Sequence, residues 1–137
     1  MINYNFETDF NLLNQKKITE WIINTIHKES HKLEEISYIF CDDEYLLNLN
    51  VNYLDHDTLT DIISFDYSVG KIVSGDVFIS IERVKENAGK FKVGFIEELH
   101  RVIIHGILHY CGYKDKKEDD KKEMRSKENY YLSQLKL

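Results

Sequence analysis

Hydrophobic and polar residues alternate in several short segments of the chain, which is the pattern of a β-strand with one buried face. In the first segment Ile2, Tyr4 and Phe6 fall on one side. Strands are predicted over residues 2–7, 33–40, 61–67 and 75–80, with a turn at residues 69–71. These segments predict three or four strands in one mixed sheet.

Helical spacing of apolar residues separates these strands and dominates the second half of the chain. Ile18, Trp21 and Ile22 recur at the spacing of one helix face, and Asn14 is a candidate N-cap before them. Helices are predicted over residues 15–28, 42–49, 81–91, 94–111 and 118–135. The fourth of these is apolar almost all round from Val102 onward, which predicts that it is buried.

The bulk composition restricts the class of protein. A chain of 137 residues with 42% apolar residues suits one domain with one core, predicted over residues 1–137. The sequence contains no proline and no repeat, and nothing in it indicates a domain boundary. The net charge of −6 argues against broad nucleic-acid binding but is compatible with a local basic groove.

Cysteine usage and the N-terminal segment bear on the compartment. Cys41 and Cys111 lie in apolar segments, so reduced buried thiols are favoured over a disulfide, and no Cys-x-x-Cys pair is present. The first ten or so residues carry acids where a signal peptide needs bases, and no apolar run approaches the roughly 20 residues that span a bilayer. We therefore expect a cytoplasmic protein without a membrane partner.

The most informative segment is His-Gly-Ile-Leu-His-Tyr-Cys-Gly-Tyr-Lys-Asp, residues 105–115. Its histidines, His105 and His109, are four residues apart, so both imidazoles leave the same face of a helix. Gly112 can take the left-handed conformation that ends a helix, which turns the chain back and brings Asp115 toward the histidines. Three protein ligands and one position left for water form a catalytic zinc arrangement.

Two histidines with this spacing are more often ordinary core or surface residues than metal ligands. Three observations favour a metal here. A buried imidazole without a partner on an apolar helix is costly. Gly106 in mid-helix indicates that another group approaches the backbone. The frame His-x-x-x-His-x-x-Gly-x-x-Asp also repeats the metzincin spacing apart from its last ligand. Metzincins need glutamate where Gly106 stands, so peptide hydrolysis by their mechanism is not expected.

The residues around the histidines resemble a known family. The segment from His105 to Tyr113 is similar to the signature of the YbeY family, metal-dependent bacterial endoribonucleases that act in ribosomal RNA maturation. Order and spacing agree over about residues 36–132. The other segments that carry the resemblance are Leu-Asn-Val-Asn-Tyr (49–53), Thr-Asp-Ile-Ile-Ser-Phe (60–65), Ser-Gly-Asp-Val-Phe-Ile-Ser (74–80) and Glu-Glu-Leu (97–99).

This resemblance implies a single α+β domain with a mixed four-stranded sheet, about five helices and a zincin-like metal helix at its centre. It implies one Zn²⁺ per chain, with other divalent ions as alternatives, at the site that the spacing predicts for His105, His109 and Asp115. It further implies a hydrolase that cleaves single-stranded RNA, with ribosomal RNA and the small ribosomal subunit as partners and no nucleotide cofactor. Its role would be maturation and quality control of small-subunit ribosomal RNA.

The chain departs from the family pattern at two positions. The usual third ligand is a histidine, and Asp115 in its place would make a bound water less acidic and favour harder ions such as Mn²⁺. A frequent arginine, a candidate phosphate contact, is replaced by Leu54, and its loss bears on catalytic strength. His56 is a candidate replacement for that arginine, and a solvated loop residue is at least as good an interpretation.

Three further residues are candidates for catalysis. Arg101, one turn before His105, could contact a substrate phosphate, and a salt bridge to Glu97 is the equal alternative. Asp61 and Asp76 lie in predicted strands that the family fold brings to the same region, as a general base or a partner of a histidine nitrogen. A cap or strand-end hydrogen bond is the more ordinary role for each.

Lysines follow the metal motif from Lys114 to Lys127 and could line an RNA path. Acidic residues are interleaved with them, as on a solvated helix face, and this interpretation is favoured, with Lys114 and Lys116 as exceptions.

Two rival functions stay open at this stage. A ribosome-assembly factor with a structural metal and weak or no nuclease activity would close the fourth coordination position, whereas an enzyme leaves it open to water. A metal hydrolase for a smaller substrate would have a narrow pocket instead of a groove.

Overall fold

The computed structural model describes residues 1–54 and 59–137. Its elements in chain order are β1 (Ile2–Phe6), α1 (Gln15–Lys28), β2 (Lys32–Cys41), α2 (Asp43–Leu54), β3 (Ile62–Asp66), β4 (Ile72–Ser80), α3 (Ile81–Phe91), α4 (Phe95–Tyr110) and α5 (Glu118–Gln134). The predicted α+β architecture, with a four-stranded sheet and five helices, is confirmed.

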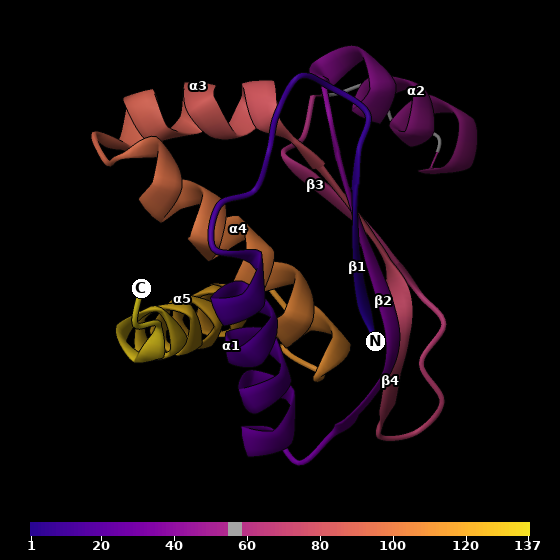
Figure 1. The fold of residues 1–137 in the computed structure, drawn as a ribbon, viewed down its shortest axis with the longest axis vertical. Coiled ribbons are helices and arrows are strands. Elements are labelled where there is room, and N and C mark those ends of the chain that lie inside the picture. The colour runs from indigo at the N-terminus through magenta and orange to yellow at the C-terminus, as the bar shows by residue number, and fades with distance from the viewer. Residues whose placement is uncertain (55–58) are drawn as a thin grey trace.

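The four strands form one mixed sheet in the order β1-β2-β4-β3. β2 pairs in parallel with both β1 and β4, whereas β3 runs antiparallel to β4 and forms one edge. Figure 1 shows α1, α4 and α5 on one side of the sheet and α2 near one end on the other side. The edge strand β3 contacts both α2 and the central helix α4.

The main core fills the space between the sheet and helices α1, α4 and α5. On β4, Val77 and Ile79 are fully buried, as are Ile103 and Ile107 on α4. The apolar stretch of α4 is buried because it packs against the sheet on one side and against neighbouring helices on the other, as its sequence predicted.

Alternation along β3 decides which of its side chains can reach a site on α4. Ile63 and Phe65 belong to a second, smaller apolar cluster beneath α2. Ile62 and Ser64 therefore project to the α4 side of the sheet, where Ile62 Cδ1 lies near the α4 backbone.

Several predicted boundaries differ from those observed. β4 begins at Ile72, three residues before the predicted start, and α2 continues to Leu54. The turn at residues 69–71 is confirmed by a bridge between Val69 and Ile72. Asn14 is the N-cap residue of α1, as predicted, but its φ is 61° and its side chain makes no capping hydrogen bond.

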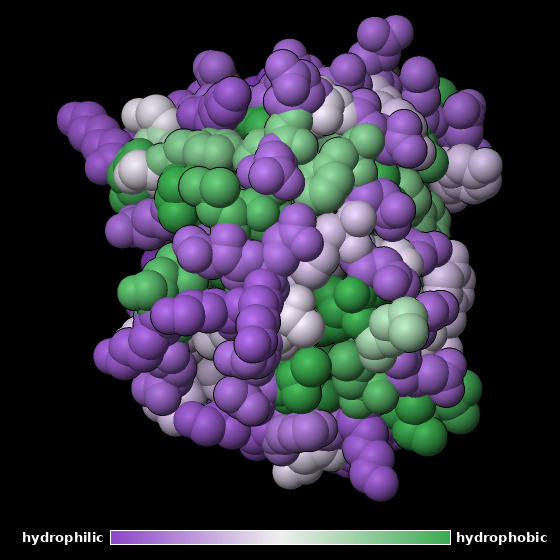
Figure 2. All heavy atoms as spheres, in the orientation of Figure 1, coloured by the Kyte–Doolittle hydropathy of each residue, from purple (hydrophilic) through white to green (hydrophobic). Residues whose placement is uncertain are grey.

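Hydrophilic residues cover much of the face shown in Figure 2, and hydrophobic residues gather in separate groups between them. Both cysteines, Cys41 and Cys111, are free thiols, as predicted. Among the helices of the described residues, none combines the length and apolar character needed to cross a membrane.

Candidate metal centre

Helix α4 presents His105 and His109 on one face, one turn apart. Their Nε2 atoms lie 3.0 Å from each other. The helix sits close to the sheet at this level because Gly106 has no side chain. A Cβ there would lie 3.2 Å from Ile62 Cδ1 and 3.4 Å from Val77 Cγ1. The close approach predicted at Gly106 is therefore made by the sheet.

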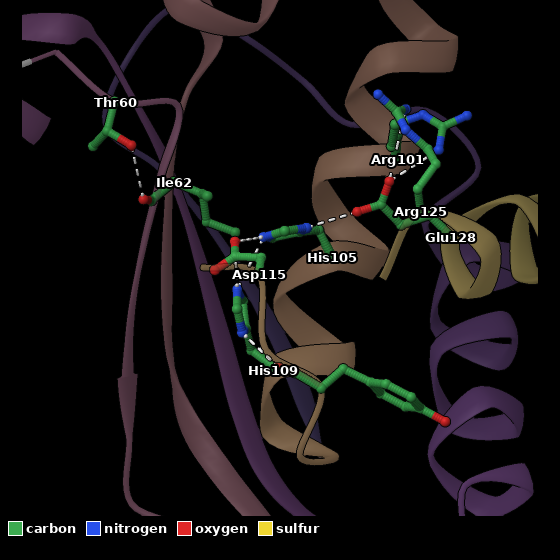
Figure 3. Close-up of polar contacts among 9 residues, drawn as sticks. Thr60, Ile62, Arg101, His105, His109, Asp115, Arg125 and Glu128 are labelled. Carbon is green, nitrogen blue, oxygen red and sulfur yellow. Dashed lines mark hydrogen bonds and ion pairs between the residues drawn. The ribbon is translucent and has the colours of Figure 1, made fainter. Parts of the chain in front are cut away.

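The end of α4 turns Asp115 back toward the histidines. Gly112 has a φ of 102°. The N–H groups of Gly112 and Tyr113 donate to carbonyls of the last helical turn, each at 3.0 Å, which are the two bonds of a Schellman motif. Asp115 Oδ2 then lies 3.1 Å from His105 Nε2 and 3.3 Å from His109 Nε2 (Figure 3).

The outer nitrogen of each imidazole has its own protein partner. His105 Nδ1 lies 2.7 Å from Glu128 Oε2, and His109 Nδ1 lies 2.9 Å from the carbonyl oxygen of Tyr113. Since an ionised carboxylate and a carbonyl only accept hydrogen bonds, each Nδ1 carries the hydrogen. The Nε2 atoms, which face Asp115, are then the nitrogens available to a metal.

The donor atoms of His105, His109 and Asp115 all lie within 4.8 Å of one another, so they could share one ion. Two imidazoles and one carboxylate suit Zn²⁺ and also harder divalent ions. The three side chains are 20%, 29% and 39% exposed, respectively, so the cluster is partly open to solvent. The structure thus brings the three predicted ligands together in a cluster that could bind a metal ion.

Charge also favours a cation at this point. Burial opposes a positive charge on His105, but the carboxylates of Glu128, Asp115 and Asp61 together outweigh it and raise the pKa of His105 above its ordinary value. Burial likewise opposes the charge on Glu128, but His105 and Arg101 hold the pKa of Glu128 below its usual range. Glu128 is therefore a charged carboxylate behind the first imidazole, and a metal ion would replace a proton on His105.

The cluster opens into a cavity of about 380 Å³ between α4, α5 and the edge strand β3. Its wall includes Ile62 and Ser64 from the strand. Its charged lining comprises Asp61, Glu98, Arg101, Asp115, Arg125 and Glu128. Burial raises the pKa of both Asp61 and Glu98, so these two carboxyls bind protons more readily than exposed ones.

Comparison with known proteins identifies the family. The family model described as endoribonuclease YbeY matches residues 2–136. This chain belongs to the YbeY family. The endoribonuclease YbeY of Flavobacterium johnsoniae is 60% identical over 129 residues, which cover 94% of this chain and 93% of that protein. The YbeY endoribonuclease of Flavobacterium psychrophilum is 57% identical over 132 residues, with 96% and 94% covered.

A YbeY-like fold is also seen in a solved structure. The solution structure of a Thermotoga maritima protein matches with a TM-score of 0.70 at 27% sequence identity, covering 98% of this chain and 89% of that one. The family resemblance, the fold and the enzyme class predicted from the sequence, an endoribonuclease acting on phosphodiester bonds, are confirmed by these matches.

Besides His105, two of the predicted catalytic residues lie at this YbeY-family site. Arg101 lines the cavity, and its Nη1 donates to Glu128 Oε1 at 2.9 Å, so its salt bridge is to Glu128 and not to Glu97. Asp61 also lines the cavity. Its backbone carbonyl accepts from the Ser80 N–H at 3.0 Å, so it also makes the ordinary strand-end bond.

Of the other two predicted residues, the structure describes only Asp76. Asp76 is wrongly predicted to face the site, because side chains alternate along β4 and Val77 next to it takes the core side. The Asp76 carboxylate instead accepts a hydrogen bond from the Tyr67 hydroxyl at 3.3 Å. His56 lies outside the described residues.

The sequence-based prediction missed Glu128, which joins His105 to Arg101 and is only 6% exposed. The position of Glu128 on the buried face of α5 could have revealed it. This helix buries Met124, Glu128 and Tyr131, which are spaced as one helix face. A glutamate at an apolar position of an amphipathic helix requires a charged partner, because burial of an unpaired carboxylate is costly.

Proposed function

We propose that this member of the YbeY family is a metal-dependent endoribonuclease specific for single-stranded RNA. In this proposal it acts in the cytoplasm on small-subunit ribosomal RNA, in maturation and quality control, without a nucleotide cofactor. The observation that carries the proposal is the convergence of His105, His109 and Asp115 beside a solvent-open cavity. The printed name of the matched relatives, endoribonuclease, supports the reaction class.

The metal centre would depend on residues of α4 and α5. A bound zinc ion would supply a Lewis acid and a water acidic enough to give hydroxide near neutral pH. His105, His109 and Asp115 would hold the ion. Glu128 and the Tyr113 carbonyl would keep the two rings in the required tautomer and orientation, since they already bind both Nδ1 atoms.

The cavity wall would act on the phosphodiester. Arg101 and Arg125 are the cations of its lining and would attract the phosphate. Arg101 is already bound to Glu128 at 2.9 Å, whereas the Arg125 side chain is 58% exposed and freer to reorient toward substrate. Asp61, with its pKa raised by burial, would hold or release a proton beside the reacting groups.

A ribosome-assembly factor with weak nuclease activity is the second candidate. The observation that favours it is the charge of the cavity, where four carboxylates, Asp61, Glu98, Asp115 and Glu128, accompany two arginines. Such a wall attracts phosphate poorly unless a metal is bound. The exposure of the three proposed ligands favours the enzyme, because a structural site would be closed to water.

The test combines metal analysis with RNA cleavage. The parent, His109→Ala, Asp115→Ala and the surface control Asp9→Ala would be purified and their zinc and manganese contents measured. We expect about one metal ion per chain in the parent and the control, and loss of metal in the two site variants. Cleavage would be measured on a single-stranded RNA and on the same sequence in a duplex.

The outcomes separate the candidates. Cleavage of the single strand by the parent and the control, lost on chelation and restored by Zn²⁺ or Mn²⁺, would support the nuclease. Stoichiometric metal without cleavage would favour the assembly factor. Full metal content in both site variants would contradict the three-ligand proposal itself.

A further inference from the structure

A second concavity lies on the outer side of α5, next to the metal cavity. It has a volume of about 420 Å³ and is lined by Lys121, Lys122, Arg125, Ser126 and Asn129. None of these residues is acidic, although the chain as a whole has 24 acidic and 18 basic residues. We call Lys121, Lys122 and Arg125 the α5 basic strip.

The charges of the strip are available to a ligand. Lys121 and Arg125 are four residues apart, so they lie on the same side of α5 about 6 Å apart along its axis. Their side chains are 57% and 58% exposed. Their contacts with acids, Glu118 and Glu128, are both long at 3.8 Å. Exposed pairs of this kind contribute little free energy and are readily exchanged for another anion.

The strip continues the metal cavity. Arg125 lines both concavities, and Figure 3 shows it beside Arg101 next to the Glu128 carboxylate. On the other side of the metal centre, a third concavity of about 490 Å³ shares His109 with the metal cavity and is lined by Lys116. The metal cavity is thus flanked by cations on both sides, with three of them on α5.

This arrangement suits a chain of phosphates more than a single one. The cavity itself holds four carboxyl groups and two arginines, so it attracts the phosphates that flank a scissile bond only weakly. Stronger attraction for these flanking phosphates must come from outside the cavity. Ser126 and Asn129 add neutral groups of the kind that bind phosphate oxygens beside lysine and arginine.

We propose that the α5 basic strip binds backbone phosphates of the single-stranded RNA on one side of the metal centre. The inference rests on the proposed function for the identity of the polyanion. Beyond the proposed function, the inference specifies where the RNA strand runs on the protein surface. It also names the residues that set the affinity for RNA longer than the cleaved dinucleotide. Lys121 and Lys122 of the strip position the substrate and take no part in the chemical step, whereas Arg125 also lines the metal cavity.

The test neutralises the strip and measures the salt dependence of binding. The variant Lys121→Gln/Lys122→Gln/Arg125→Gln would be compared with the parent. The charge-matched control is Lys16→Gln/Lys71→Gln/Lys90→Gln, which changes three exposed lysines that line none of these concavities. Binding of a labelled single-stranded RNA of about twelve nucleotides would be followed by fluorescence anisotropy in EDTA over a range of KCl concentrations.

Three lost phosphate contacts should reduce the slope of log affinity against log salt by about 2. Between about 50 and 200 mM KCl, the parent should then lose roughly 16-fold more affinity than the strip variant. The control should follow the parent. With zinc present, the double variant Lys121→Gln/Lys122→Gln, which keeps Arg125 of the metal cavity, should show a raised KM for this RNA with kcat nearly unchanged.

Equal salt slopes for parent and strip variant would overturn the inference, even if the parent cleaves RNA and the proposed function stands. An equal loss of slope in the control would also overturn it, because the effect would then reflect net charge alone. Strip-dependent binding without cleavage would support the strip while contradicting the proposed nuclease. A parent that binds no RNA would overturn both.

Discussion

Replacement of Glu128 by glutamine tests whether α5 holds the first metal ligand in place. In the parent, one carboxylate oxygen lies 2.7 Å from His105 Nδ1 and the other 2.9 Å from Arg101 Nη1. Glutamine has nearly the same size and helix propensity, but it has one accepting oxygen and no charge. Its amide nitrogen would face one of the two donors that the carboxylate now accepts from.

The expected magnitude follows from these two contacts. A hydrogen bond to a charged group contributes about 1.5–3 kcal/mol, and Glu128→Gln loses one such bond and weakens the other. Because the Arg101 side chain keeps 18% exposure, water offsets part of the loss, and we expect a destabilisation of about 2–3 kcal/mol. For a domain of this size that is a fall in Tm of roughly 6–12 °C.

The effect on metal is the decisive part. A ligand histidine that loses its orienting partner typically loses about 10–100-fold in metal affinity. Thermal unfolding in EDTA would give the stability of the metal-free protein, and competition with a chromophoric chelator would give the zinc affinity. The control is Glu123→Gln, an exposed residue of the same helix, which should shift stability by no more than about 0.5 kcal/mol. Unchanged zinc affinity in a folded Glu128→Gln protein would refute the positioning role.

Three further outcomes are expected. Gly75→Ala should destabilise by about 2–4 kcal/mol in urea titrations, because its Cβ would collide with the Tyr110 hydroxyl and a backbone oxygen. Gly89→Ala, with open space around it, should instead stabilise by about 0.5–1 kcal/mol, and an equal response at both sites would contradict this packing. Burial opposes the negative charge of Glu29, but tyrosine hydroxyls and a lysine outweigh it and lower the pKa of Glu29. The charged Glu29 therefore stabilises the folded protein above about pH 4.3, and this stabilisation is lost on acidification. Glu29→Gln should therefore lower the free energy of unfolding by about 1 kcal/mol at neutral pH, and the difference from the parent should narrow below about pH 4. A difference that stays constant with pH would contradict this prediction. Asp115→His should raise the preference for Zn²⁺ over Mn²⁺ in competition titrations, and an unchanged preference would show that Asp115 is not a ligand.

Local pattern is sufficient for the elements whose burial repeats within the segment. Helices α1 and α3 begin and end at the predicted residues, 15–28 and 81–91, because their buried residues recur at helical spacing. The start of β4 is different. Residues 72–74 are extended because they pair with Lys32, Leu33 and Glu35 of β2, far away in sequence. No periodicity in residues 72–74 themselves shows that partner.

The same distinction applies to the site. The motif in residues 105–115 is local, so spacing and one helix-ending glycine are enough to predict that His105, His109 and Asp115 meet. The errors at Asp76 and Glu128 concern contacts between distant segments. To place Asp76 correctly, one has to know which face of β4 turns toward α4. To find Glu128, one has to know how α5 packs on α4.

An aspartate ligand can be accommodated because the rest of the cavity limits its own negative charge. Arg101 neutralises Glu128 at 2.9 Å, so the carboxylate behind His105 adds little net charge to the site. Burial raises the pKa of Asp61 and Glu98, so these two carboxyls take up a proton more readily than exposed ones. Two neutral imidazoles and Asp115 would then leave a divalent ion with net positive charge, enough to attract one phosphate. The neighbouring phosphates would gain little from this single charge, which is why their attraction is expected from the cations of α5.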